Sequence, residues 1–118
     1  MKNINHVSLS GNLVADSEFD KVLKFTIANN ENRRDGDEWE EYANYFDCVI
    51  FGNYGAAMED ILKKGTKVCI SGRLSQSRWE DKETGYMKSR IQVVVDNVEA
   101  FNAKAKEEEK SKKNYRRR

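Results

Sequence analysis

The chain has 118 residues, the length of one small domain, and its 21 Lys and Arg nearly balance 20 Asp and Glu, for a net charge of +1. Residues 102–118 hold eight of the basic residues and three of the acidic ones, so this segment is strongly basic and residues 1–101 are mildly acidic. No apolar run is long enough to span a membrane and no signal peptide is visible, so a cytoplasmic location is expected. Cys48 and Cys69 are predicted to be small buried hydrophobes, and with His6 as the only histidine a cysteine-rich zinc site is excluded.

The first two predicted strands alternate apolar and polar side chains, which is typical of a strand with one buried face. Residues 4–13 place Val7, Leu9, Gly11 and Leu13 on one face. Residues 22–29 direct Leu23, Phe25 and Ile27 inward. The polar residues 16–20 are predicted to form a connection, and residues 30–41 a loop with a turn at Asp35-Gly36.

The third predicted strand, residues 43–52, has aromatic side chains on both faces. Phe46, Cys48 and Ile50 share one face. Tyr45, Val49 and Phe51 share the other, interrupted by Asp47. This second aromatic face is either another packing surface or a platform for a flat ligand. The strand pattern alone slightly favours packing.

The remaining elements are a helix and two strands. Residues 54–64 repeat apolar side chains with helical spacing and end at Lys63-Lys64-Gly65, a combination typical of a helix C-terminus. Residues 66–74 form the fourth predicted strand, with Val68, Ile70 and Leu74 inward. Residues 81–85 form a turn and residues 86–98 the fifth strand. We expect a domain over residues 1–102 and a basic, disordered tail over 103–118.

The predicted fold class is therefore all-β with one short helix. Three strands, a helix and two strands is the order of the OB-fold, a five-stranded Greek-key barrel with a helix between strands three and four. Gly11 and Gly72 each interrupt an apolar face, as expected at the sharp bends of a small closed barrel. OB-folds bind oligonucleotides or oligosaccharides.

An ordered set of segments carries a family resemblance. The segments are 7–13 (VSLSGNL), 25–28 (FTIA), 46–52 (FDCVIFG), 62–65 (LKKG), 68–74 with its Gly72-Arg73-Leu74, and 78–81 (RWED). Over roughly residues 4–101 the chain resembles bacterial and phage single-stranded DNA-binding proteins. The resemblance implies a homotetramer that binds single-stranded DNA without catalysis or cofactor, in replication, recombination or repair, in the cytoplasm at the nucleoid.

The resemblance also implies roles for individual residues. Tyr45, Phe51 and Trp79 match positions that stack on bases, and Arg33 stands where the family has a further stacking residue. With the family in view, stacking is favoured over packing for Tyr45 and Phe51. The candidate phosphate contacts are Lys24, Lys64, Arg73, Arg78, Lys88 and Arg90. For each of these alone, a solvated surface charge is about as good an interpretation.

Three residues near the proposed platform have other interpretations. Trp39 follows an acidic stretch that would repel phosphate, so we expect it to pack against the sheet or a partner subunit. His6 is expected to contact DNA or a neighbouring subunit rather than a metal. Asp47 lies between Tyr45 and Phe51, where a carboxylate is unfavourable near phosphate unless it pairs with a base edge or a cation.

The chain departs from the family pattern at two places. Ser75 and Ser77 stand on the fourth strand, where family members often carry cations. The family usually ends in a short acidic tip that recruits replication and repair proteins. Residues 114–118 here read NYRRR, so any such partners are not expected to bind through an acidic tip.

Two other classes of binding protein stay open, an OB-fold protein that binds RNA and a replisome subunit that uses the aromatic face to dock a protein. Contacts to the 2′-hydroxyl would distinguish RNA from DNA binding. An enzyme is the poorest interpretation, because the sequence presents no nucleophile–base pair, metal-ligand cluster or phosphate-binding loop.

Overall fold

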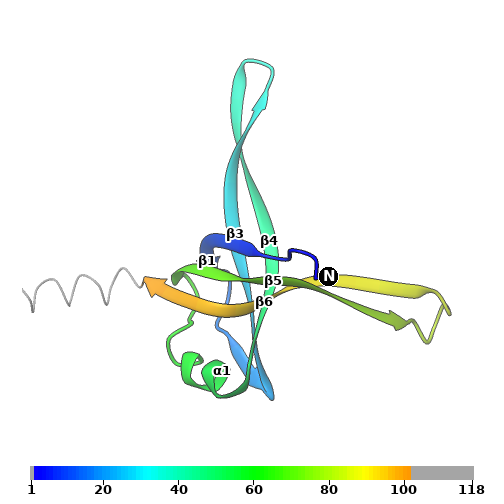
Figure 1. Ribbon diagram of the computed structural model, residues 1–118. Helices are drawn as coiled ribbons and strands as arrows, with labels where there is room; N and C mark the ends of the chain where they lie inside the picture. The colour runs from blue at the N-terminus through cyan, green and yellow to red at the C-terminus, as the bar shows by residue number, and fades with distance from the viewer. Residues whose placement is uncertain (1, 102–118) are drawn as a thin grey trace, which may run out of the picture.

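The computed structural model describes residues 2–101 and contains six strands and one helix (Figure 1). In chain order these are β1 (Val7–Leu13), β2 (Glu18–Asp20), β3 (Val22–Asp35), β4 (Glu38–Phe51), α1 (Gly52–Met58), β5 (Lys67–Glu80) and β6 (Met87–Phe101). The predicted tail over 103–118 lies outside the described residues. No helix of the described part of the chain has the length and apolarity to cross a bilayer.

Five of the strands close into a barrel, which confirms the predicted fold class. The sheet order is β1-β5-β6-β4-β3-β2, and β1 pairs again with β3 at Asn12 and Leu13, so the ring closes. The core is filled from the inward faces of these strands and by Leu62 after the helix. Its fully buried members include Leu23, Ile27, Ile50, Leu62, Val68 and Val93.

The helix lies between β4 and β5, the place expected for an OB-fold, but it is shorter than the predicted 54–64. It ends at Met58, and a turn follows in which Leu62 N–H donates to Met58 O at 2.9 Å. Gly65 has a positive φ of 86°, and its N–H donates to Leu13 O, so the glycine turns the chain into β5. The Tyr54 hydroxyl ties α1 to β6 by accepting from Val98 N–H and donating to Val98 O.

Two long hairpins project from the barrel and carry the residues of interest (Figure 1). The β3–β4 ladder continues without interruption to Asp35 and Glu38, so the predicted loop over 30–41 was wrong. These residues are exposed on both faces, and the strands therefore show no alternation of apolar and polar side chains. The β5–β6 ladder likewise runs out to Glu80 and Met87.

Three further expectations need correction. The segment predicted as a connection contains β2, whose residues are all exposed and pair with β3. Cys69 is exposed, whereas Cys48 is buried as predicted. Leu74 is also exposed, because it lies where β5 leaves the barrel wall, beyond a register shift between Ser71 and Gly72.

Candidate nucleic-acid interface

The strand registers bring most of the candidate residues onto one face, which we call the binding face. Its members on β3 and β4 are Lys24, Thr26, Tyr45, Asp47, Val49 and Phe51, because Val49 is paired with Lys24 and Asp47 with Thr26. Val49 is also paired with Val94 of β6, which extends the face across the parallel β4–β6 ladder. The members on β5 and β6 are Arg73, Ser75, Ser77, Trp79, Lys88, Arg90, Gln92 and Val94.

Three aromatic side chains are exposed on the binding face. Tyr45 is 66% exposed, Phe51 53% and Trp79 45%. Val49 and Val94 are buried, yet neither belongs to the core cluster inside the barrel, because both point outward. The two valines form an apolar floor in the middle of the face. Tyr45 and Phe51 are therefore not core residues of this chain, which removes packing inside the barrel as an explanation for them.

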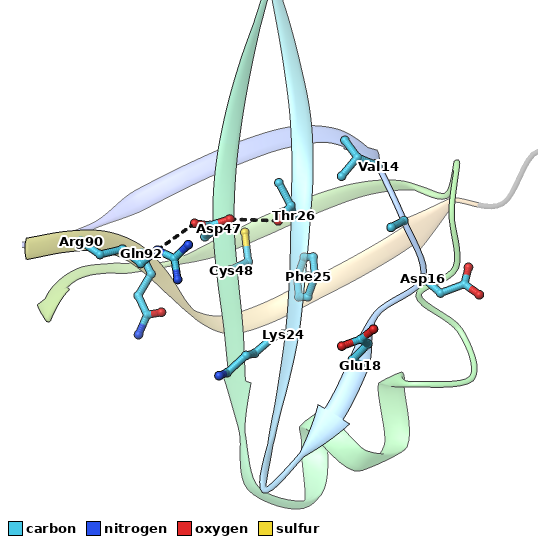
Figure 2. Close-up of a pocket in the computed structure, with 11 residues that line it drawn as sticks. Val14, Asp16, Glu18, Lys24, Phe25, Thr26, Asp47, Cys48, Arg90 and Gln92 are labelled. Carbon is cyan, nitrogen blue, oxygen red and sulfur yellow. Dashed lines mark hydrogen bonds and ion pairs between the residues drawn. The ribbon is translucent and has the colours of Figure 1, made fainter. Parts of the chain in front are cut away.

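Asp47 occupies the centre of the binding face and has two partners there. Its Oδ1 accepts from Thr26 Oγ1 at 2.9 Å, and its Oδ2 lies 3.3 Å from Arg90 Nε (Figure 2). Arg90 therefore supplies the nearby cation that a carboxylate at this position requires. The ion pair links β4 to β6, two strands that are paired at Cys48–Val93 and Val49–Val94.

A pocket of about 290 Å³ opens beside this pair. Figure 2 shows Lys24, Arg90 and Gln92 around it, with Asp16 and Glu18 on the side away from Arg90. Neither Thr26 nor Gln92 was predicted as a site residue. Their positions follow only from the cross-strand registers, although the outward placement of Thr26 was visible in the alternation of residues 22–29.

The other cations of the binding face differ in their partners. Lys88 Nζ forms an ion pair with Asp81 Oδ2 at the hairpin turn. The hydrogen bond from Lys88, followed by that from Glu83 N–H, holds the pKa of the Asp81 carboxyl below its usual value. Within residues 2–101, Lys24 and Arg73 take part in no ion pair. They are the cations that a phosphate could engage without displacing a carboxylate.

Three predicted contacts lie away from the binding face. Arg33 stands on the opposite face of the β3–β4 hairpin, with its guanidinium 3.5 Å from the Tyr42 ring centroid and its Nε paired with Glu31. Arg78 stands on the opposite face of the β5–β6 hairpin from Trp79, and its Nη2 donates to Gln76. Lys64 lies in the turn before β5, where its N–H donates to Asp16. Their DNA contacts stay predictions.

Two other expectations concern exposed residues. Trp39 is 68% exposed near the tip of the β3–β4 hairpin, so it does not pack against the sheet of its own chain as one alternative had it. His6 precedes β1 and is exposed. Residues 2–101 contain no group of three or more His, Cys, Asp or Glu arranged to hold a metal ion.

Known proteins resemble this chain in sequence and in fold. The sequence matches the Single-strand binding protein family over residues 4–101. It is 42% identical to a single-stranded DNA-binding protein of Borreliella burgdorferi, covering 87% of this chain and 73% of the relative. A single-stranded DNA-binding protein of Treponema pallidum is 36% identical, covering 84% of this chain and 58% of the relative.

Among solved structures, the fold resembles that in a Plasmodium falciparum SSB complex with ssDNA. The TM-score is 0.77 at 19% identity, covering 86% of this chain and 98% of that one. At this identity the likeness concerns the fold alone, and it supports the OB-fold assignment. The family is shown by the sequence match over nearly all of the described residues and by the 42% identical relative. The chain belongs to the Single-strand binding protein family.

Proposed function

We propose that this protein binds single-stranded DNA largely without regard to sequence and protects it during replication, recombination and repair. The observation that carries the proposal is the exposure of Tyr45, Phe51 and Trp79 on one face with Lys24, Arg73, Lys88 and Arg90. Every base offers a flat surface, so stacking on these rings tolerates any sequence and contributes about 1–3 kcal/mol per base. The relatives from Borreliella burgdorferi and Treponema pallidum are named single-stranded DNA-binding proteins.

The cations give the second half of the mechanism. They track the phosphate backbone while the bases face the rings, and each phosphate contact releases condensed counterions. Lys88 and Arg90 share their charge with Asp81 and Asp47, so they contribute less than Lys24 and Arg73. We propose a binding role without catalysis for the domain over residues 1–102, and a location in the cytoplasm at the nucleoid.

Trp79 offers a direct test, because a base stacked on an indole quenches its fluorescence. The chain has two tryptophans, so Trp39→Phe leaves Trp79 as the only reporter. Adding oligothymidine should quench that signal, with affinity falling as salt rises. Trp79→Ala should weaken binding by about 1–3 kcal/mol. Absence of quenching and of salt dependence would refute the proposal.

The same titration separates the two alternative binding functions. Matched DNA and RNA strands distinguish a DNA-binding from an RNA-binding protein, because a site specific for RNA uses the 2′-hydroxyl. A protein-docking subunit would show negligible affinity for either strand. Comparing the full chain with a 1–102 truncation at two salt concentrations then measures the contribution of the basic segment 103–118.

We also propose a homo-oligomer, a tetramer as in the family. Two features support it. The edge of β1 opposite β5 has no strand partner over Val7–Leu9 within the described chain, and an unpaired edge can receive another strand. The side of the β5–β6 hairpin away from Trp79 exposes Leu74, Met87 and Ile91, an apolar stripe suited to burial against a second copy. A monomer mass by light scattering at micromolar concentration would contradict this.

A further inference from the structure

We infer that the pocket beside Asp47 is a subsite that reads the edge of one nucleobase and prefers guanine. This inference rests on the proposed function and adds a modest base preference to stacking that is otherwise indifferent to sequence. The groups that carry it are Asp47, Thr26 and Arg90, in the pocket of about 290 Å³ on the binding face (Figure 2).

The Asp47 carboxylate retains unused capacity to accept hydrogen bonds. An ionised carboxylate has about four lone-pair sites on its two oxygens. One partner is present on each oxygen, Thr26 on Oδ1 and Arg90 on Oδ2. The Asp47 side chain is 43% exposed, so the remaining sites are open to a ligand in the pocket. Both partners also hold the carboxylate in place before DNA arrives.

A phosphate is a poor occupant of this position, because the carboxylate would repel it. A base edge that donates hydrogen bonds is a good one. Guanine presents two adjacent donors on its Watson–Crick edge, N1–H and the N2 amino group, which match the two oxygens of a carboxylate. Cytosine and adenine each offer a single amino group beside an acceptor, and thymine a single N–H between two carbonyls.

Neighbouring groups complete the recognition. Tyr45 precedes Asp47 by two residues on the same strand, so their side chains leave the same face about 7 Å apart. A purine stacked on Tyr45 can therefore direct its edge toward Asp47. Arg90 and Gln92 line the same pocket and can donate to the guanine O6. Arg90 and Lys24 also offset the charge of Asp47 toward the adjoining phosphates.

The pocket is large enough to hold a single base. Pockets for drug-sized ligands span about 300–1,000 Å³, and this pocket lies just below that range. The position of Asp47 between two stacking residues, rather than at the rim, makes the subsite part of the DNA path. It is therefore a source of specificity that works on whichever nucleotide is stacked at Tyr45.

The test compares oligothymidines of equal length that carry isolated dG, isolated deoxyinosine or isolated dA, never adjacent, so that guanine quartets do not form. Deoxyinosine keeps N1–H and O6 but lacks the N2 amino group. The full-length protein should bind the dG strand about five- to tenfold more tightly than either of the others, the lower part of the range for bidentate base contacts. This comparison needs no substitution in the protein.

Asp47→Asn supplies the second arm. Asparagine keeps the shape and can still accept from Thr26, but its amino group opposes the guanine donors, so the dG strand should lose its advantage over the deoxyinosine and dA strands. Glu99→Gln, which removes one negative charge from β6 on the far side of its register shift, is the matched control and should keep the preference. Equal, salt-sensitive binding of all strands, or a preference that survives Asp47→Asn, would overturn the guanine subsite and leave single-stranded DNA binding intact. Binding of no strand would overturn both.

Discussion

Asp47 and Arg90 form an ion pair across the parallel β4–β6 ladder, with 3.3 Å between Asp47 Oδ2 and Arg90 Nε. Both side chains are substantially exposed, so the pair contributes little to the stability of the fold. Its effect is on the binding face, where it fixes a guanidinium between the aromatic side chains and cancels the one carboxylate among them. A strand of DNA that lies across this face meets a polar centre that is close to neutral, with uncompensated cations at Lys24 and Arg73.

This arrangement predicts unequal contributions from the basic residues. Arg73→Gln should lower affinity for oligothymidine and make the slope of log K against log salt shallower by about 0.7, the loss of one phosphate contact on a single strand. Arg73 takes part in no ion pair within residues 2–101, so its full charge is available. Titrations at several salt concentrations measure both quantities.

Arg78→Gln is the matched comparison, because Arg78 stands on the same strand but on the opposite face of the hairpin. If the DNA stays on the binding face, this variant should keep the slope of the unmodified protein. A loss equal to that of Arg73→Gln would show instead that the strand wraps around the hairpin and that Arg78 contacts phosphate, as the sequence predicts.

The β3–β4 hairpin provides an internal control for stacking. Tyr45 and Tyr42 are the same residue type on opposite faces of β4. Tyr45→Ala should weaken DNA binding by about 1–3 kcal/mol, because it removes an exposed stacking ring from the binding face. Equilibrium titration with oligothymidine measures the loss.

Tyr42→Ala should leave affinity nearly unchanged if the DNA keeps to the binding face. It removes the ring under the Arg33 guanidinium and so also tests that residue. If Arg33 and Tyr42 together stack on a base, then Tyr42→Ala would weaken binding as much as Tyr45→Ala, and the interface would extend around the hairpin.

The barrel was predictable because burial on one face leaves a pattern in the sequence. Leu23, Phe25 and Ile27 alternate with polar residues, and they are the inward side chains of β3. The outer halves of both hairpins meet solvent on all sides, so nothing in residues 30–41 distinguishes a strand from a loop. Cys69 was misplaced because its residue type favours burial, although its position between the inward Val68 and Ile70 indicates the outer face. Leu74 was misplaced because local alternation does not tell where the barrel wall ends.

The candidate site, like the fold, could be predicted from the sequence only in part. Tyr45 and Phe51 stood out as aromatic residues on a second face, and the structure exposes both. The pairing of Asp47 with Arg90 could not be foreseen, since it depends on the register between β4 and β6, which are joined through a helix and the whole of β5. Long-range register is a property of the closed sheet and leaves no local signal.

Replacement of Gly72 by alanine, a small change, is expected to lower the stability of the fold strongly. A Cβ at this position would collide with the carbonyl oxygen of Val94, which is backbone and cannot rotate away. Gly72→Ala should therefore force β5 and β6 apart at the register shift, at a cost of about 1–3 kcal/mol. Thermal unfolding should show a fall in Tm of several degrees, about 4–8 °C per kcal/mol for a domain of this size.

Ser71→Ala, at the preceding residue of the same strand, is the control and should change Tm by little. Ser71 is half-buried, and its hydroxyl takes part in no hydrogen bond within the described chain. A Tm for Gly72→Ala within a degree of that control would show that the sheet can absorb the extra methyl group.

The two cysteines should differ sharply in reactivity and in their effect on alkaline stability. Burial, and secondarily the charge of Asp47, raises the pKa of the Cys48 thiol from 9.0 to about 12, whereas Cys69 is exposed. A thiol reagent at neutral pH should modify Cys69 readily and Cys48 only after unfolding, because the thiolate is the reactive form. As pH rises above about 9, the unfolded chain releases the Cys48 proton and the folded chain keeps it. The free energy of unfolding therefore falls by up to about 1.4 kcal/mol per pH unit until the folded pKa is reached.

Denaturant titrations of the unmodified protein and of Cys48→Ala between about pH 8 and about pH 10 isolate this effect, since the remaining titrating groups are common to both. The unmodified protein should lose more stability than the variant over that interval, and parallel losses would mean that Cys48 ionises as easily in the folded chain as in the unfolded one.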